Sequence, residues 1–433
     1  MRQFRKAAIA AVVAAALTPA GVAVAQDKPV KMSVVSFLSG PAAGPFGVPA
    51  RNGAEVVILA INAGKLPAPH NSKGLAGRAI EAEYIDESGG NTKQVAEYRN
   101  MVEKRGVDVA LGYVSSGTCE ALTPVAEELK KLTVYAVCGT PRIFEESKPQ
   151  YVFRTMSHAT SDNVAAAYYV REYFPKIKGY TGINQNYAWG QDSWRDFDAA
   201  MKQLTKAKAS TKLQWPKLFQ GQYSTEISAL LLDKADLIHS SFYDGDLESF
   251  IFQGQTRGLF KKKQVVFTVG ETSVYRLNKR MPEGVVLGAR GPYGVIVLNR
   301  PSALNKWFIA AYKDRFGSYP PGPAYQYAQA VLATKIAYDA AAKKAGAFPS
   351  QDQVIAELKG AEFESFSTHV KMALGDGHQA ITENGYGITK WDAKAGEVKL
   401  EKVKFYPAEC VNPPAGVKSV DWINGGMKGA KCG

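Results

Sequence analysis

The sequence lacks the motifs that mark common classes of enzyme. It has no GxGxxG or GxxxxGK[ST] loop for nucleotide phosphates, no GxSxG serine elbow and no HExxH zinc motif. Its five histidines show none of the spacings that metal ligands have. Carboxylate pairs such as Glu127-Glu128 and Glu145-Glu146 lie on polar segments, where solvation is the ordinary role. These absences argue against a hydrolase and predict that the chain is no enzyme and binds no cofactor or metal.

Long hydrophobic runs are also missing, and the one apolar run near the start is too short for a membrane span. Cations within residues 2–6 precede an apolar run over 7–17, and Ala23-Val24-Ala25 has the pattern of a signal-peptidase site. The run is about half of the roughly 20 residues that cross a bilayer. Residue 26 is Gln, whereas a lipid anchor would require Cys. We therefore expect a signal peptide over 1–25 and a soluble protein in the periplasm.

Acidic residues are outnumbered by basic ones, 40 to 53, which gives a formal net charge of +13. Loss of the three cations in the expected signal peptide lowers this value to +10. Such an excess can indicate a nucleic-acid partner. However, the cations are dispersed, and the one dense run, Lys261-Lys262-Lys263, falls between an expected helix and an expected strand, where a solvated loop is typical. We expect no nucleic-acid partner.

Cysteine is scarce, with four residues and no pair at the close spacing of a zinc knuckle or a redox CxxC. An even number suits an exported protein, and four cysteines allow three pairings. We expect disulfides between sequence neighbours, Cys119–Cys138 and Cys410–Cys432. Because Cys138 also lies in a candidate ligand loop, a free Cys138 stays open as an alternative.

What the sequence has in abundance is β-rich runs that alternate with amphipathic helices. One helical stripe consists of Ala50, Ala54, Val57, Ile58 and Ile61. This alternation predicts βαβ units and parallel sheets covered on both faces, and 433 residues are too many for one core. The predicted fold class is α/β, with two doubly wound parallel-sheet lobes joined by a multi-crossing hinge. The β-rich runs lie at 31–37, 80–85, 107–114, 133–137, 180–184, 236–242, 264–269 and 285–289.

The two expected lobes are discontinuous in sequence. The helical segments 304–316 and 324–345 follow the last strand expected in the second lobe, and we expect them to return to the first. After Trp391 the chain is polar and rich in Pro and Gly, which indicates a disulfide-stapled tail. The expected boundaries are 26–153 and 291–372 for the N-terminal lobe, and 154–290 and 373–433 for the C-terminal lobe.

Turns that combine hydroxyls with small residues follow two successive strands of the expected first lobe. They are Ser115-Ser116-Gly117-Thr118 and Cys138-Gly139-Thr140-Pro141, which we call the carboxylate cradle. In open α/β sheets, ligands bind beyond the carboxyl ends of the strands. Backbone N–H groups at helix N-termini, together with hydroxyls, can hold a carboxylate without Lys or Arg. Ordinary helix capping is the better explanation of either turn alone. When two such turns follow successive strands, a ligand site explains them as well as capping does.

In the second lobe, Glu271 follows the expected strand 264–269 and stands beside a glycine. It is suited either to neutralise a ligand ammonium or to serve as a helix N-terminal acid. Aromatic residues also stand at strand ends, where they could cover an apolar ligand or pack in the core. They are Phe46, Trp189, Phe242 and Tyr243.

Several short motifs, in order, resemble the leucine/isoleucine/valine-type substrate-binding proteins of ABC importers, which have the type I periplasmic binding fold. The resemblance covers almost the whole chain after residue 26. The motifs are Gly40–Gly47, Gly53-Ala54, Ala60–Gly64, Gly112–Ser116, Phe153-Arg154-Thr155, Trp189-Gly190 and the helix pattern from Phe316 to Ala330.

The resemblance implies a site between the lobes. In such proteins three groups hold the ligand carboxylate. They are a serine that matches Ser116, beside Ser115, a backbone position that matches Cys138, next to Gly139, and a threonine that matches Thr140. Phe46, Trp189 and either Phe242 or Tyr243 line the side-chain pocket, and Glu271 binds the α-ammonium. The implied partners are a small carboxylate-bearing solute, such as a branched-chain or other amino acid or an aromatic acid, and the permease subunits of an importer. The implied state is a monomer.

Other functions use the same fold. A periplasmic sensory component would bind its ligand in the same cleft, and amides or urea-like solutes would fill it in place of a carboxylate. The run Lys65–His70 replaces a short glycine-rich link of the family, and Trp189 stands where a tyrosine is common. The identity of the solute therefore stays open at the level of the sequence.

Overall fold

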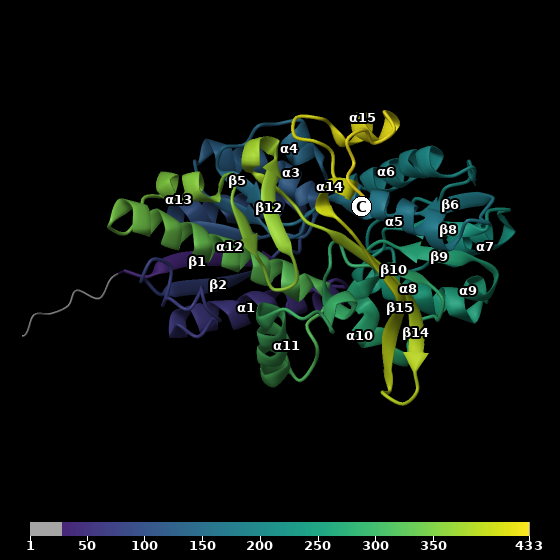
Figure 1. The fold of residues 1–433 in the computed structure, drawn as a ribbon, viewed down its shortest axis with the longest axis horizontal. Helices are drawn as coiled ribbons and strands as arrows, with labels where there is room; N and C mark the ends of the chain where they lie inside the picture. The colour runs from purple at the N-terminus through teal and green to yellow at the C-terminus, as the bar shows by residue number, and fades with distance from the viewer. Residues whose placement is uncertain (1–27, 433) are drawn as a thin grey trace, which may run out of the picture.

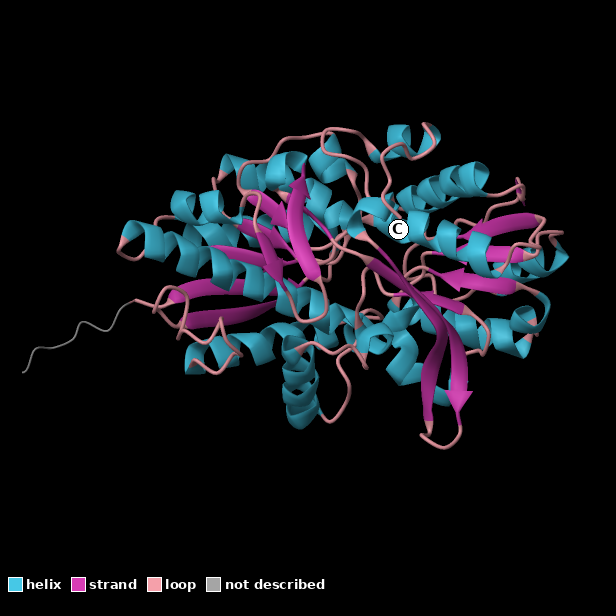
Figure 2. Cartoon of the chain, in the orientation of Figure 1, coloured by secondary structure: helices cyan, strands magenta, loops and turns pink. Residues whose placement is uncertain are grey.

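The computed structural model describes residues 28–432, so the expected signal peptide lies outside the described part. Two sheets form the frame, each with mostly parallel strands and helices on both faces (Figures 1 and 2). The first contains β1 (Val30–Ser36), β2 (Ile80–Asp86), β3 (Val109–Gly112), β4 (Thr133–Tyr135), β5 (Val152–Arg154), β11 (Glu362–Glu364), β12 (His369–Leu374) and β13 (Gln379–Ile381). The second contains β6 (Gly179–Ile183), β7 (Lys208–Ala209), β8 (Leu237–Ser240), β9 (Gln264–Phe267), β10 (Val286–Gly288), β14 (Asn384–Asp392) and β15 (Glu397–Tyr406).

The two sheets repeat one strand order. The parallel part of the first runs β2-β1-β3-β4-β5, and that of the second runs β7-β6-β8-β9-β10. Both are the doubly wound order in which the direction of winding reverses between the first and third strands of the series. The first sheet is extended by β13-β12-β11 and the second by the antiparallel β14-β15 pair. This confirms the two-lobed α/β fold class.

Helices cover the sheets as the alternation predicts. The longest, α12, packs against α1 on the first lobe, and α5 packs against α6 on the second. The helices are α1 (Val48–Ala63), α2 (Gly90–Arg99), α3 (Ser116–Glu128), α4 (Arg142–Glu145), α5 (Ala159–Tyr173), α6 (Ala188–Leu204), α7 (Ser224–Leu232), α8 (Asp244–Thr256), α9 (Leu259–Lys262), α10 (Val274–Leu277), α11 (Ala303–Phe316), α12 (Gly322–Ala345), α13 (Gln351–Leu358), α14 (Ala408–Val411) and α15 (Ser419–Asn424). Within residues 28–432, no helix is long and apolar enough to span a membrane.

The chain crosses between the sheets three times, after β5, after β10 and after β13. In Figure 1 the first lobe lies on the left and the second on the right, and the yellow-green β14-β15 pair descends at the junction. Each lobe is therefore built from separate stretches of sequence. Such crossings are typical of hinges between lobes.

The structure adds strands where the sequence analysis expected none. The region after Trp391 holds β15, a ten-residue strand of the second sheet, and only then the small helices of a tail. The first sheet continues to Ile381 through β12 and β13, past the lobe boundary expected at residue 372.

Two disulfides are present among the described residues, Cys119–Cys138 and Cys410–Cys432, with sequence separations of 19 and 22. They are the pairings between neighbours that we expected. The first joins the helix after β3 to the turn after β4, so it ties together both halves of the carboxylate cradle. The second closes the C-terminal tail on itself.

Candidate functional site

The carboxyl ends of the strands in the two sheets face each other at the lobe interface. The reversal of winding lies between β1 and β3 in the first lobe and between β6 and β8 in the second. In doubly wound sheets the crevice at this reversal is where ligands bind. Most of the residues proposed from the sequence follow these strands. They are Phe46 after β1, Ser115 and Ser116 after β3, Trp189 after β6, and Phe242 and Tyr243 after β8.

Ser116 is the centre of the carboxylate cradle. Its buried Oγ accepts hydrogen bonds from the backbone N–H groups of Gly139 and Thr140, at 3.1 and 3.2 Å. Because both N–H groups donate to this oxygen, the hydroxyl proton of Ser116 remains for a further acceptor. The two turns that the sequence analysis proposed therefore meet, and their donors converge on one hydroxyl.

Two buried charged residues hold the cradle in place, and the sequence analysis assigned a role to neither. Glu87 accepts hydrogen bonds from the N–H groups of Val114 and Ser115 at 2.7 and 2.8 Å. Burial raises the pKa of Glu87 to about 7. Arg154 donates from Nη1 to the carbonyl oxygens of Cys138 and Thr140 at 2.6 and 2.7 Å. These bonds fix the main chain on both sides of Ser116.

Thr140 has a different environment from the one implied by the family resemblance. Its Oγ1 donates to Oδ2 of Asp192 in the second lobe at 2.7 Å. Asp192 also accepts from Arg142 of the first lobe at 2.8 Å. The hydroxyl proton of Thr140 is thus used in a contact between the lobes, and in this conformation it is not directed to a ligand.

Across the interface, Trp189 and Arg290 cover the cradle. The indole Nε1 of Trp189 donates to the carbonyl oxygen of Ser241 at 2.9 Å, which fixes the ring. The guanidinium of Arg290 stacks on this ring at 3.7 Å and donates to the carbonyl oxygen of Val137 in the first lobe. A Cβ on Gly139 would lie 2.7 Å from Trp189 and 2.8 Å from Arg290. Glycine at this position therefore allows the second lobe to reach the cradle.

Arg290 was not among the proposed residues, although it reaches across the interface to Val137, the residue before the cradle turn Cys138–Pro141. It follows β10, is 5% exposed and has a left-handed backbone with φ of 53°. Its Nε lies 3.4 Å from Oδ2 of Asp162. Burial raises the pKa of Asp162 to about 7 and lowers the pKa of Arg290. A buried guanidinium on the same side of the interface as the unused hydroxyl proton of Ser116 makes the region favourable for an anion.

The aromatic residues divide into two groups. Phe46 contacts Tyr243 edge to face at 5.7 Å across the interface, and the hydroxyls of Tyr243 and Tyr187 lie 2.8 Å apart. Phe242 instead packs against Tyr223 at 5.1 Å, within the core of the second lobe. Of the two alternatives left by the sequence, Tyr243 is the one that faces the first lobe.

Glu271 is fully buried and its carboxylate is already used. Oε1 accepts from the N–H of Val295 at 2.9 Å, and Oε2 accepts from the N–H of Gly322 at 2.6 Å. Burial raises its pKa to about 8. Gly322 begins α12, so Glu271 connects the end of β9 to a helix of the first lobe. In this conformation it caps a helix, which is the alternative that the sequence analysis left open.

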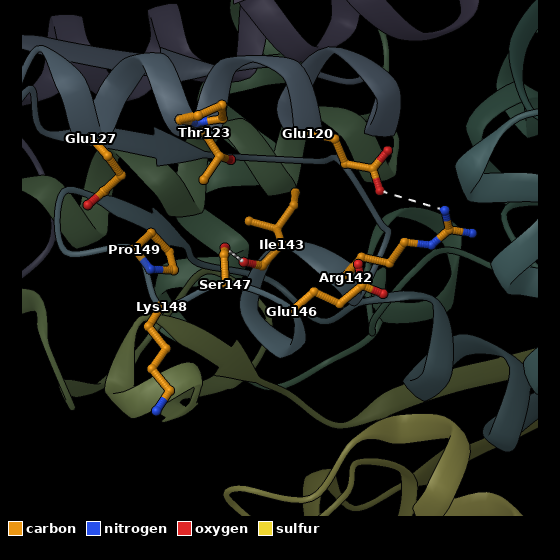
Figure 3. Close-up of a pocket in the computed structure, with 10 residues that line it drawn as sticks. Glu120, Thr123, Glu127, Arg142, Ile143, Glu146, Ser147, Lys148 and Pro149 are labelled. Carbon is orange, nitrogen blue, oxygen red and sulfur yellow. Dashed lines mark hydrogen bonds and ion pairs between the residues drawn. The ribbon is translucent and has the colours of Figure 1, made fainter.

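One further feature lies apart from the predicted ligand residues. A cavity of about 460 Å³ opens between α3 and α4 (Figure 3). Glu120 and Arg142 form an ion pair at 4.0 Å at one end of it, and Ser147 donates to the carbonyl oxygen of Ile143 at 2.5 Å. None of the predicted ligand residues lines this cavity. Over residues 28–432, no group of three or more His, Cys, Asp or Glu side chains is placed to hold a metal.

The sequence profile of periplasmic binding proteins matches residues 29–397. Solved structures share the fold. A solute-binding protein of an ABC transporter from Rhodopseudomonas palustris BisB5, in complex with 3,4-dihydroxybenzoic acid, is 20% identical, with a TM-score of 0.74 over 88% of this chain and 98% of that one. A second R. palustris solute-binding protein, with benzoate, is 17% identical, with a TM-score of 0.74 over 90% and 100% of the two chains. A leucine-binding protein from Thermotoga maritima is 18% identical, with a TM-score of 0.68 over 86% and 98%. No curated protein sequence matched the chain.

Proposed function

Because the chain belongs to the periplasmic binding protein family, we propose that it is the solute-binding component of an ABC importer, and that it captures a small carboxylate-bearing solute between its lobes. The observation that carries the proposal is the meeting of the Ser116 hydroxyl with the N–H groups of Gly139 and Thr140, opposite Arg290. These groups are donors or cations, and they follow the carboxyl ends of β3, β4 and β10.

A carboxylate fits this set of groups chemically. Its oxygens accept several hydrogen bonds, and bonds to ionised partners are stronger than neutral ones. Ser116 would donate its free hydroxyl proton, and Arg290 would move from the carbonyl of Val137 to the carboxylate. Trp189, Tyr243 and Phe46 would cover the apolar part of the solute. These roles make the cradle and the aromatic residues parts of one site.

Two classes of solute suit such a site, aromatic acids and amino acids. Solved relatives are in complex with benzoate and hydroxylated benzoates, and one is a leucine-binding protein. The flat surfaces of Trp189 and Tyr243 favour an aromatic acid. Glu271, which would bind an α-ammonium, already accepts two N–H groups. We therefore place aromatic acids first and amino acids second.

The remaining parts of the proposal follow from family membership. The mature chain would act in the periplasm as a monomer, would deliver its solute to permease subunits and would catalyse no reaction. The lobes would close on the solute as a hinge, because each lobe holds only part of the site.

Calorimetry and thermal unfolding with benzoate, 4-hydroxybenzoate and leucine test the proposal. A solute at 100 times its Kd should stabilise the protein by about 2.7 kcal/mol. Ser116→Ala should weaken binding by about 1–3 kcal/mol and reduce this stabilisation accordingly. Ser147→Ala is the matched control, because this serine also lies in the first lobe but donates to a helix carbonyl away from the interface. If no carboxylate binds, or if Ser116→Ala binds as the wild type does, the proposed function is wrong.

A further inference from the structure

The second lobe contains a buried acid that lacks a partner on one side. Asp244 is the first residue of α8, directly after Tyr243, and it is 0% exposed. Its Oδ1 accepts from the N–H of Asp246 at 3.3 Å. Its Oδ2 is buried, and no hydrogen-bond partner for it exists in the described part of the chain. A buried polar atom without a partner is costly, so such an atom calls for an explanation.

No ion pair joins Asp244 to a cation within residues 28–432. The charged groups that act on it most strongly are two acids, Asp246 and Glu248, and the backbone N–H groups of Gly245 and Asp246 act on its carboxyl in the opposite direction. Asp246 is occupied by Tyr223, Gln185 and the N–H of Phe219, and Glu248 pairs with Arg276 at 2.8 Å. Burial accordingly raises the pKa of Asp244 well above its usual value. Asp244 is thus the acid at this end of the sheet that still has an oxygen to offer.

Asp244 lies next to Tyr243, which contacts Phe46 of the first lobe, and β9 separates its strand, β8, from β10, which Arg290 follows. Burial raises the pKa of Tyr187, whose hydroxyl lies 2.8 Å from that of Tyr243, and Arg290 and Asp244 act on this pKa in opposite directions. Both charges are therefore close to the same hydroxyl pair. A Cβ on the next residue, Gly245, would lie 3.0 Å from Pro41 of the first lobe.

Two serine hydroxyls that follow the same strand as Asp244 or the neighbouring strand also lack hydrogen-bond partners in the described part of the chain. Oγ of Ser241, directly after β8, and Oγ of Ser273, after β9, are buried and have no hydrogen-bond partner within residues 28–432. Three polar groups without partners thus belong to the carboxyl ends of two neighbouring strands, β8 and β9. Their grouping indicates that a polar part of the bound solute satisfies them.

We propose that Asp244 accepts a hydrogen bond from a donor at the end of the solute opposite its carboxylate, and so selects solutes that carry such a donor. This inference rests on the proposed function, in which the carboxylate lies between Ser116 and Arg290. The ammonium of an α-amino acid is adjacent to its carboxylate, whereas Arg290 and Asp244 follow strands β10 and β8, with β9 between them. The geometry therefore favours a solute with a distal hydroxyl or ammonium on a flat apolar body.

Three probes that differ only at the far end test the inference by calorimetry, namely benzoate, 4-hydroxybenzoate and 4-(aminomethyl)benzoate. The wild type should bind at least one donor-bearing probe about tenfold or more tighter than benzoate, because the added donor would supply a hydrogen bond to a buried oxygen that otherwise lacks one. In Asp244→Asn the preference should fall to within about twofold. Asparagine tolerates the left-handed backbone at this position, where φ is 50°, so the variant should fold. Glu248→Gln, on the same helix, is the matched control and should keep the preference.

Proton release distinguishes the two donors. An ammonium would ionise Asp244 and release a proton, so the heat of binding would depend on the ionisation enthalpy of the buffer. A hydroxyl would release none. If the wild type shows no preference, or if Asp244→Asn keeps it, the inference is wrong, while Ser116-dependent binding of benzoate would still support the proposed function. If no probe binds in a Ser116-dependent way, the proposed function fails and the inference fails with it.

Discussion

Gly139→Ala tests whether the contact between the cradle and the second lobe controls closure. A Cβ at this position would lie 2.7 Å from Cε3 of Trp189 and 2.8 Å from Cζ of Arg290. Neither partner can easily withdraw, because Trp189 donates to the carbonyl of Ser241 and Arg290 donates to that of Val137. The backbone of Gly139 is not left-handed, so alanine adds only the steric conflict.

The conflict exists only when the lobes are together. Overpacking by one methyl group in a close-packed region costs about 1–3 kcal/mol. If the lobes open without solute, this cost falls on the closed form alone, and the affinity for the solute should fall by about 5- to 150-fold. The free energy of unfolding of the solute-free protein should change little, since both lobes keep their own cores.

Calorimetry measures the loss of affinity, and small-angle scattering with saturating solute measures compaction. Chemical denaturation without solute checks the fold. Gly179→Ala is the matched control, because its Cβ would lie 3.4 Å from Cα of Ala235 within the second lobe and would not touch the first. Wild-type affinity and wild-type compaction in Gly139→Ala would refute the reasoning that this contact belongs to the closed, solute-bound form.

Ser116→Ala should weaken the binding of carboxylates by about 1–3 kcal/mol and the binding of amide analogues by less. Thr140→Ala should weaken the binding of both classes alike, since its hydroxyl joins the lobes. Calorimetry with benzoate and benzamide distinguishes the two variants. The raised pKa of Glu271, about 8, means that the folded state binds more protons than the unfolded state, so stability should fall as pH rises from about 4.5 to 8. Glu271→Gln should remove that part of the pH dependence in denaturation curves. Replacing Cys410 and Cys432 by serine should lower the free energy of unfolding by about 3 kcal/mol. Peptide maps of the non-reduced wild type should show Cys410 linked to Cys432 and to no other cysteine.

The alternation of strands and helices was predictable because burial gives the apolar residues of each element a clear period in the sequence. Strand β15 was not predictable, for two physical reasons. Its sequence alternates charged and apolar residues, as is common where a strand forms the edge of a sheet. The alternation also shifts by one residue between Leu400 and Val403, where Lys402 has φ of 50° and the pairing with β14 changes register. A bulge of this kind hides a strand from any test for a period of two.

The cradle was predictable because its hydroxyls follow two strand ends that a parallel sheet brings together. Arg290 was not, since its contacts reach Val137, which is 153 residues earlier in the chain and in the other lobe. The acids show the same limit. Glu271 and Asp244 both follow strands of the second sheet, and only the three-dimensional arrangement reveals that backbone N–H groups occupy the first and leave the second with a spare oxygen.

The unpartnered groups at the interface also bear on how closure is coupled to binding. In this conformation, Oδ2 of Asp244 and the hydroxyls of Ser241 and Ser273 are buried and have no hydrogen-bond partner among residues 28–432. Each such group costs about 1–3 kcal/mol, whereas opening would return it to water. If the lobes close as a hinge, as we propose, closure without solute is penalised at the second lobe, although Arg290 and Thr140 make bonds across the interface that favour it. A solute that satisfies the unpartnered groups removes the penalty, so its binding shifts the population to the closed form by its differential affinity for that form.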